Sequence, residues 1–170
     1  NAIYIVKLLI SMCQDSYTEI RHRRSSKLIV ENNNFVFPDD IQDGDALVAF
    51  SRRKVLMLAT LLKKKGYTVS VIYGSLPYSV RKAEMARFLS GESRIVVCTD
   101  AIGMGVNLPI RRVIFTEVEK FDGLIKRRLN MGEIKQIAGR AGRKGLYDQG
   151  YVNAFEGREY IAALVAGKYK

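Results

Sequence analysis

Two arginines lie three residues apart in the glycine-rich stretch QIAGRAGRKG, which begins at Gln136. If this stretch is helical, Gln136, Arg140 and Arg143 fall within about 60° of one another, opposite an apolar side. Gly139 and Gly142 would flank these side chains and leave room for a ligand. Guanidinium groups are rigid forks that suit phosphate oxygens, so the pair predicts a triphosphate site. The alternative is a solvated basic surface that binds nothing in particular.

A second stretch with the residues for ligand chemistry is CTDAIGMGVNLP, which follows the apolar run RIVVC. Thr99 and Asp100 come directly after that run, and Gly103 and Gly105 would let the backbone approach a ligand closely. The glycine spacing is also that of the start of a dinucleotide fingerprint, but Leu108 stands where its third glycine belongs, which disfavours a nicotinamide site. A plain turn is the remaining alternative.

The elements that must position these stretches alternate between strands and helices. Strands are expected over 45–50, 67–74, 93–100, 111–117 and 150–155, and amphipathic helices over 51–66 and 77–91. Ser51 is expected to cap the first helix and Gly66 to end it, while Pro77 opens the second and Gly91 closes it. This alternation predicts an α/β fold, with a parallel sheet covered by helices on both faces. Functional loops then belong at the carboxyl ends of the strands.

The chain before Asp45 is less regular. NAIYIVKLLISMCQ is expected to be a helix, and HRRSSKLIVENNN an edge strand that runs into a polar turn. We therefore expect residues 1–44 to be an entry segment from an upstream domain, and residues 45–170 to form one domain.

Charge and composition limit the partners. The 170 residues carry a formal net charge of +11, and the stretch 111–145 holds ten basic against four acidic side chains. Such an excess favours a polyanion such as nucleic acid. No apolar run approaches the roughly 20 residues that span a bilayer, so a membrane partner is not expected. With His22 as the only histidine and Cys13 far from Cys98, no zinc site or histidine-based triad is predicted, and Cys98 is expected to be a buried, reduced thiol.

Three stretches, in this order, carry a family resemblance. VAFSRR, CTDAIGMGVNLP and QIAGRAGR resemble motifs IV, V and VI of superfamily-two helicases, and YGSLPYSVRKAEMARF between the first two is also similar. The resemblance covers about Asp45 to Phe155 and is greatest for the degradosome RNA helicases of mitochondria and their bacterial relatives. It implies the second of two RecA-like domains, with ATP bound in the cleft between them.

The resemblance also implies roles for individual residues. Arg140 and Arg143 match the arginine fingers that stabilise charge on the γ-phosphate, and Gln136 matches a residue that arranges nucleotide and water. Other residues on the nucleotide side are Gly103, Gly105 and Asn107, although DEAD-box relatives carry aspartate at the last position. The implied contacts with the nucleic-acid backbone come from Ser51, Arg52, Gly74, Thr99 and Asp100, and Asp100 is also implied to link motif V to motif VI.

Two parts of a helicase motor are missing from the sequence. It contains neither a G-x-x-x-x-G-K-[ST] phosphate loop nor a D-E-x-[HD] magnesium box, both of which belong to the first domain of this family. The expected role is thus half of an ATP-dependent hydrolase, inactive alone, that binds single-stranded RNA, with Mg²⁺ held by the upstream RecA-like domain.

The sequence leaves several alternatives open. A DNA helicase or translocase and a non-enzymatic RNA-binding module are the competing functions, and a ribonuclease is a further candidate partner. The expected location is intracellular: cytoplasmic for a bacterial protein and mitochondrial for a eukaryotic one.

Overall fold

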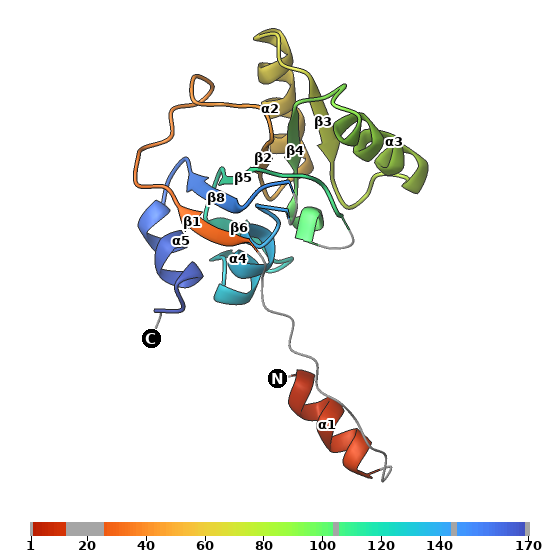
Figure 1. Ribbon diagram of the computed structural model, residues 1–170, viewed down its shortest axis with the longest axis vertical. Coiled ribbons are helices and arrows are strands. Elements are labelled where there is room, and N and C mark those ends of the chain that lie inside the picture. The colour runs from red at the N-terminus through yellow and green to blue at the C-terminus, as the bar shows by residue number, and fades with distance from the viewer. Residues whose placement is uncertain (1, 13–25, 104–105, 144–145, 169–170) are drawn as a thin grey trace.

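The centre of the molecule is a six-stranded, all-parallel sheet with strand order β1-β8-β5-β2-β4-β3 (Figure 1). The computed structural model describes residues 2–12, 26–103, 106–143 and 146–168. The strands of the sheet are β1 (Lys27–Val30), β2 (Asp45–Val48), β3 (Val69–Ile72), β4 (Ile95–Cys98), β5 (Arg112–Phe115) and β8 (Gln149–Ala154). Because all six strands run in one direction, their carboxyl ends lie along one edge.

Helices cover both faces of the sheet. The covering helices are α2 (Arg52–Lys64), α3 (Tyr78–Leu89), α4 (Met131–Ala138) and α5 (Arg158–Val165); a further helix, α1 (Ala2–Met12), precedes the sheet, and a 3₁₀ turn, η1 (Asp100–Gly103), follows β4. Apolar side chains of α2, such as Leu58 and Leu62, pack on one face together with Leu47 and Val97. The other face packs against α3, α4 and α5 through Phe88, Ile134, Ile137 and Ile161. The predicted α/β architecture is therefore confirmed.

The expected strands and helices occur where the sequence placed them. Ser51 caps α2 by accepting a hydrogen bond from the Lys54 amide at 3.2 Å, and Gly66 follows the helix with φ of +89°. β1 is an edge strand that pairs with β8 alone, as expected. The division of the chain at residue 44 stays a prediction.

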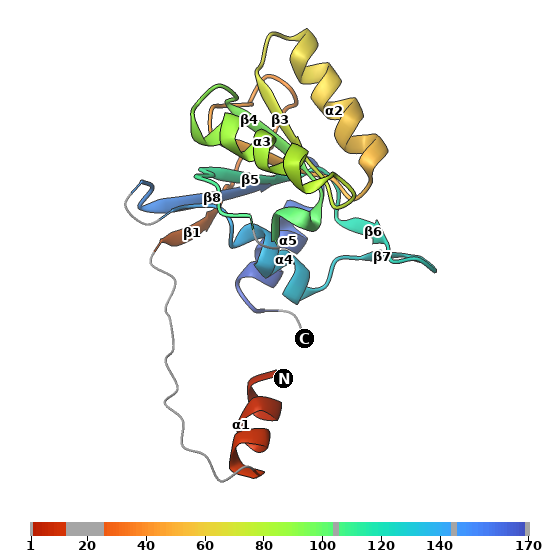
Figure 2. The same ribbon diagram turned by 90° about the vertical axis from the view of Figure 1, so that its right-hand side faces the viewer.

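Two elements were not predicted. A hairpin of β6 (Glu119–Phe121) and β7 (Lys126–Arg128) projects from the body of the molecule (Figure 2), and α5 packs beside α4. The hairpin exposes the apolar side chains of Phe121, Leu124 and Ile125 at its end.

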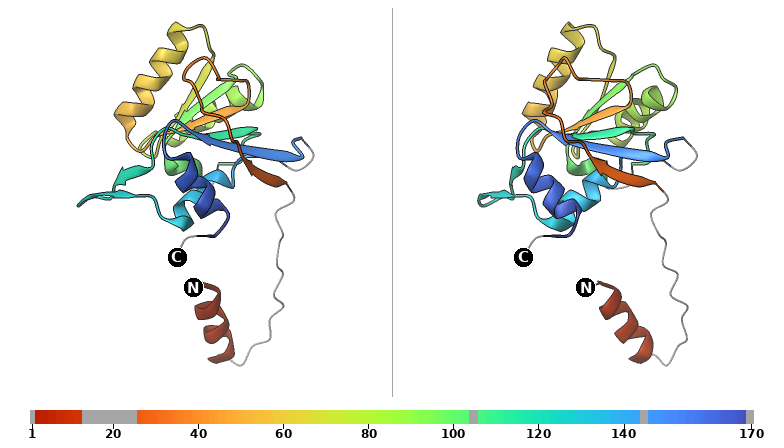
Figure 3. Two further views of the ribbon diagram at one scale, coloured as in Figure 1. Left: turned by 90° about the vertical axis from the view of Figure 1, so that its left-hand side faces the viewer. Right: turned by 60° about the vertical axis from the view of Figure 1, so that its left-hand side comes forward.

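The expected N-terminal helix is present as α1, which lies apart from the sheet and its helices (Figure 3). Within the described residues, no helix is both long enough and apolar enough to cross a membrane. Those same residues contain no cluster of three or more histidine, cysteine or acidic side chains placed to hold a metal ion. Cys98 is fully buried, as expected, and burial raises the pKa of its thiol. Cys13 and His22 lie outside the described residues.

Candidate nucleic-acid and nucleotide site

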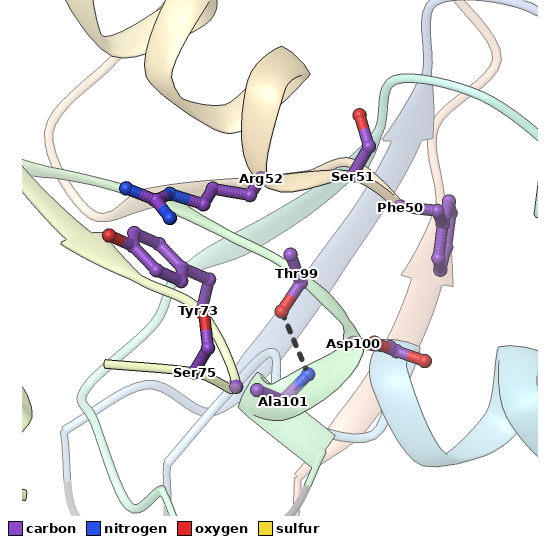
Figure 4. A pocket seen from close by; sticks show the side chains of 9 residues that line it. Phe50, Ser51, Arg52, Tyr73, Ser75, Thr99, Asp100 and Ala101 are labelled. Carbon is purple, nitrogen blue, oxygen red and sulfur yellow. Dashed lines mark hydrogen bonds between the residues drawn. The ribbon is translucent and has the colours of Figure 1, made fainter. Parts of the chain in front are cut away.

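A hollow of about 310 Å³ lies at the carboxyl ends of β2, β3 and β4 (Figure 4). Its lining comes from the three segments that follow these strands: Phe50, Ser51 and Arg52; Tyr73, Gly74 and Ser75; Thr99, Asp100 and Ala101. All five residues predicted to contact the nucleic-acid backbone, which are Ser51, Arg52, Gly74, Thr99 and Asp100, are in this lining. The parallel sheet thus brings together side chains that are up to 49 positions apart in the sequence.

Internal contacts hold the lining in place. The Arg52 guanidinium lies over the ring of Tyr73, 5.3 Å from its centroid (Figure 4). Arg81 of α3 donates to the carbonyl of Gly74 at 2.9 Å and so supports the turn after β3. Thr99 accepts a hydrogen bond from the Ala101 amide at 3.4 Å, which orients its hydroxyl at the start of η1. The hollow offers a cation, hydroxyl groups and main-chain atoms, which are the groups that bind a sugar-phosphate backbone.

Two of the residues predicted for the nucleotide side, Gln136 and Arg140, lie beside η1. α4 begins with a capping box between Asn130 and Glu133. One turn further on, Gln136 donates to the carbonyl of Gly103 at 3.1 Å. Arg140 donates to the same carbonyl and, at 3.3 Å, to that of Val106. Gln136 and Arg140 therefore hold the segment that follows β4.

The predicted single helix through both arginines is wrong. α4 ends at Ala138, and Ala141 instead forms a bridge with Ile110 beside β5. Arg143 lies beyond the helix with an exposed side chain, and the described part of the chain holds no partner for its guanidinium. Gln136 and Arg140 both donate to the carbonyl of Gly103, whereas Arg143 lies beyond Gly142, which packs against Gly150 at the start of β8.

The predicted reason for Gly142 is also wrong. Its φ is +79°, and a Cβ atom there would lie 2.9 Å from the backbone nitrogen of Gly150 in β8. Gly142 therefore permits a left-handed turn packed against the sheet and does not clear space for a ligand. Gly103 shows a related close approach, because its Cβ would lie 3.2 Å from the Gln136 side chain.

For the remaining two residues predicted for the nucleotide side, Asn107 and Gly105, the described part of the chain gives no contact that supports the prediction. Asn107 is exposed, and Gly105 lies outside the described residues. Three further residues support the lining and were not predicted from the sequence: Tyr73, Arg81 and Lys120. An aromatic residue at a strand end and an arginine one turn into the next helix were visible signals for the first two. Nothing in the sequence pointed to Lys120, because its contacts are made only in the folded chain.

Lys120 belongs to an ionic cluster at the base of the hairpin. Its ammonium lies 3.0 Å from a carboxylate oxygen of Asp100 and 3.0 Å from one of Glu133. Arg127 donates to both oxygens of Glu133, at 2.9 and 3.0 Å, and to Asp122 at 3.2 Å. The hydrogen bonds from Arg127 are the largest cause that lowers the pKa of Glu133 from 4.5 to about 2.

This pKa predicts a pH-dependent contribution to stability. Glu133 binds its proton more weakly in the folded chain than in the unfolded one, so its contribution is complete above about pH 4.5 and is lost as the pH falls to about 2. Glu133→Gln keeps the capping box but removes the charge. We expect the difference in unfolding free energy between wild type and Glu133→Gln to shrink as the pH falls through this window. A difference that stays constant from pH 7 to pH 2 would contradict the assignment.

A parallel sheet covered by helices on both faces, with a hollow at its carboxyl edge, is typical of an α/β domain of the RecA-like class. The family model of the helicase conserved C-terminal domain matches residues 27–145, and the chain belongs to this family. It is 40% identical over 168 residues to the mitochondrial ATP-dependent RNA helicase SUV3 of Saccharomyces cerevisiae, and 38% identical over 144 residues to that of Candida albicans. These alignments cover 93% and 84% of this chain.

The chain spans about a fifth of the length of these curated relatives, 22% and 20% respectively. Among solved structures, it is similar to S. cerevisiae Dbp5 bound to RNA and ADP BeF3, with a TM-score of 0.67 at 14% identity over 100% of this chain and 48% of that one. The C-terminal domain of the DEAD-box protein Dbp5 gives a TM-score of 0.62 at 16% identity, over 85% of this chain and 84% of that one. At this level of identity, the similarity shows the RecA-like fold.

Proposed function

We propose that the full-length protein is an ATP-dependent RNA helicase and that this chain is its second RecA-like domain. The observation that carries the proposal is the hollow at the carboxyl ends of β2, β3 and β4, which gathers all five predicted backbone-contacting residues next to α4. Family membership and the relatives named RNA helicases support the same function.

In this proposal the hollow binds the sugar-phosphate backbone of a single strand. Arg52 supplies positive charge, the hydroxyls of Ser51 and Thr99 supply donors, and the exposed turn at Gly74 lets the strand approach the main chain. The excess of basic residues between 111 and 145 adds a general attraction for the strand. Binding is therefore expected to be independent of base sequence.

The nucleotide side uses α4 and the segment after it. ATP would supply the phosphoanhydride bond that is broken, and the chain's donors fit its negative charge. Arg143 offers an exposed guanidinium that the described part of the chain leaves without a partner, which suits an arginine finger. Arg140 is the second finger, and Gln136 orients groups near the nucleotide while both hold the segment at Gly103. The phosphate loop and the Mg²⁺ ligands come from the upstream RecA-like domain.

The relatives also suggest where the protein acts. The SUV3 helicases are named mitochondrial, and we propose the same compartment for this protein. A ribonuclease is the proposed partner, because an unwound single strand is the substrate that such an enzyme degrades.

RNA-dependent ATP hydrolysis by the full-length protein tests this function. Saturating single-stranded RNA is expected to raise kcat at least about tenfold, which corresponds to about 1.4 kcal/mol of activation free energy. Single-stranded DNA of the same length and sequence is the control. Equal or greater stimulation by DNA would instead favour a DNA translocase, and hydrolysis that no nucleic acid stimulates would contradict the helicase function.

A further inference from the structure

Lys120 of the β6–β7 hairpin joins two carboxylates that come from distant parts of the chain. Its ammonium lies 3.0 Å from Asp100, at the start of η1, and 3.0 Å from Glu133, in the first turn of α4. The lysine side chain is only 19% exposed. Partial burial opposes its charge, but the hydrogen bonds to Glu133 and Asp100 outweigh this effect and raise the pKa of Lys120. The Lys120 ammonium therefore stays charged across the physiological pH range.

This link completes a two-point attachment of η1 to α4. At the end of η1, the carbonyl of Gly103 accepts hydrogen bonds from Gln136 and Arg140. At its start, the Asp100 carboxylate is joined to α4 through Lys120. η1 therefore lies across α4 with both ends held, and its first residue also lines the hollow.

The two carboxylates depend on Lys120 to different degrees. Glu133 keeps the two hydrogen bonds from Arg127 and the capping contact with Asn130 when the lysine is removed. Asp100 has no other ion-pair partner in the described ranges of the chain, and its side chain is 45% exposed. Loss of Lys120 would free Asp100 and leave it facing the negative charge of Glu133.

We propose that Lys120 is a positioning residue for RNA-stimulated ATP hydrolysis, acting through Asp100 to hold the RNA-facing turn η1 against the helix that carries Gln136. A strand that enters the hollow and shifts η1 thereby shifts α4 as well. Without the lysine, one of the two attachments is lost. RNA that binds in the hollow then shifts α4, and with it the nucleotide side, to a smaller extent. This inference rests on the function proposed above.

The test measures the ratio of RNA-stimulated to RNA-independent kcat in the full-length protein at saturating RNA. Lys120→Met, which keeps the side-chain length without the charge, is expected to lower this ratio about fivefold. Lys120→Arg should restore the ratio to within about twofold of wild type, because its guanidinium can still bridge two carboxylates. Lys126→Met is the matched control, since it removes the same charge from the same hairpin. Lys126 pairs with Glu119, at 3.0 Å, and not with Asp100.

A double-mutant cycle separates positioning from general destabilisation. If Lys120 acts through Asp100, then Lys120→Met combined with Asp100→Asn should lower the ratio no further than Asp100→Asn alone. Additive losses, or an equal loss in Lys126→Met, would overturn the inference. Should Lys120→Met fail to fold, Lys120→Gln, which can still hydrogen-bond to one carboxylate, takes its place in the cycle.

Failure of this inference can be told apart from failure of the proposed function. A wild-type protein that RNA stimulates, together with an unaffected Lys120→Met, would overturn only the role of Lys120. A wild-type protein that RNA does not stimulate would overturn the helicase function and this inference with it.

Discussion

Replacing Arg143 by alanine in the full-length protein is expected to lower kcat by about three orders of magnitude while changing nucleotide affinity little. The Arg143 guanidinium is exposed, and the structure records no partner for it in the part of the chain that it describes. It is therefore free to meet charge that develops at the γ-phosphate. A contact that strengthens only in the transition state appears in kcat and not in ground-state binding. Steady-state kinetics and equilibrium nucleotide binding on one preparation measure the two quantities.

Three further variants sharpen this test. Arg143→Lys should recover little activity, because an ammonium keeps the charge but loses the planar fork. Arg140→Ala should affect both hydrolysis and RNA stimulation, because Arg140 also donates to the carbonyls of Gly103 and Val106. Thr99→Ala should weaken RNA stimulation and spare RNA-independent hydrolysis. A raised KM with unchanged kcat in Arg143→Ala would show that the arginine is only a ground-state anchor.

The sheet and the hollow could be predicted because they depend on local patterns and one topological rule. Apolar runs such as DALVAF and RIVVC define buried strands, and parallel strands bring their carboxyl ends to a common edge. Ser51 and Thr99, each placed just after a strand in the sequence, therefore had to meet. Their distance along the chain did not matter, because the alternation of strands and helices already predicted that all the strands run in the same direction.

The hairpin and the end of α4 were harder to predict, for different reasons. β6 and β7 have three residues each, too few for a clear period, although Asp122–Gly123 between them is a turn signal. Asp122 accepts hydrogen bonds from the amides of Leu124 and Ile125 there, both at 3.0 Å. α4 ends early because Ala141 pairs with Ile110, a tertiary contact that the helical spacing of apolar residues does not reveal. Tertiary pairing thus overrode local periodicity.

The second large effect is expected from Gly142→Ala, between the two arginines. An alanine at φ of +79° costs about 1–2 kcal/mol of backbone strain. Its Cβ would also lie 2.9 Å from the nitrogen of Gly150 and 3.1 Å from the Cβ of Ser26, so the segment must move away from β8. The combined loss of unfolding free energy should be about 3 kcal/mol, measured by urea denaturation.

Gly66→Ala is the matched control for this prediction, since Gly66 has a similar φ of +89° but no atom within 4 Å of the added Cβ. It should lose only the backbone term, about 1–2 kcal/mol. The difference between the two variants therefore measures the close approach of the segment to β8. Because Arg143 follows Gly142 directly, that displacement should also lower ATP hydrolysis in Gly142→Ala and not in Gly66→Ala. Equal losses of stability in the two variants would show that the glycine is required for its backbone conformation alone, and that contact with β8 does not position the arginine.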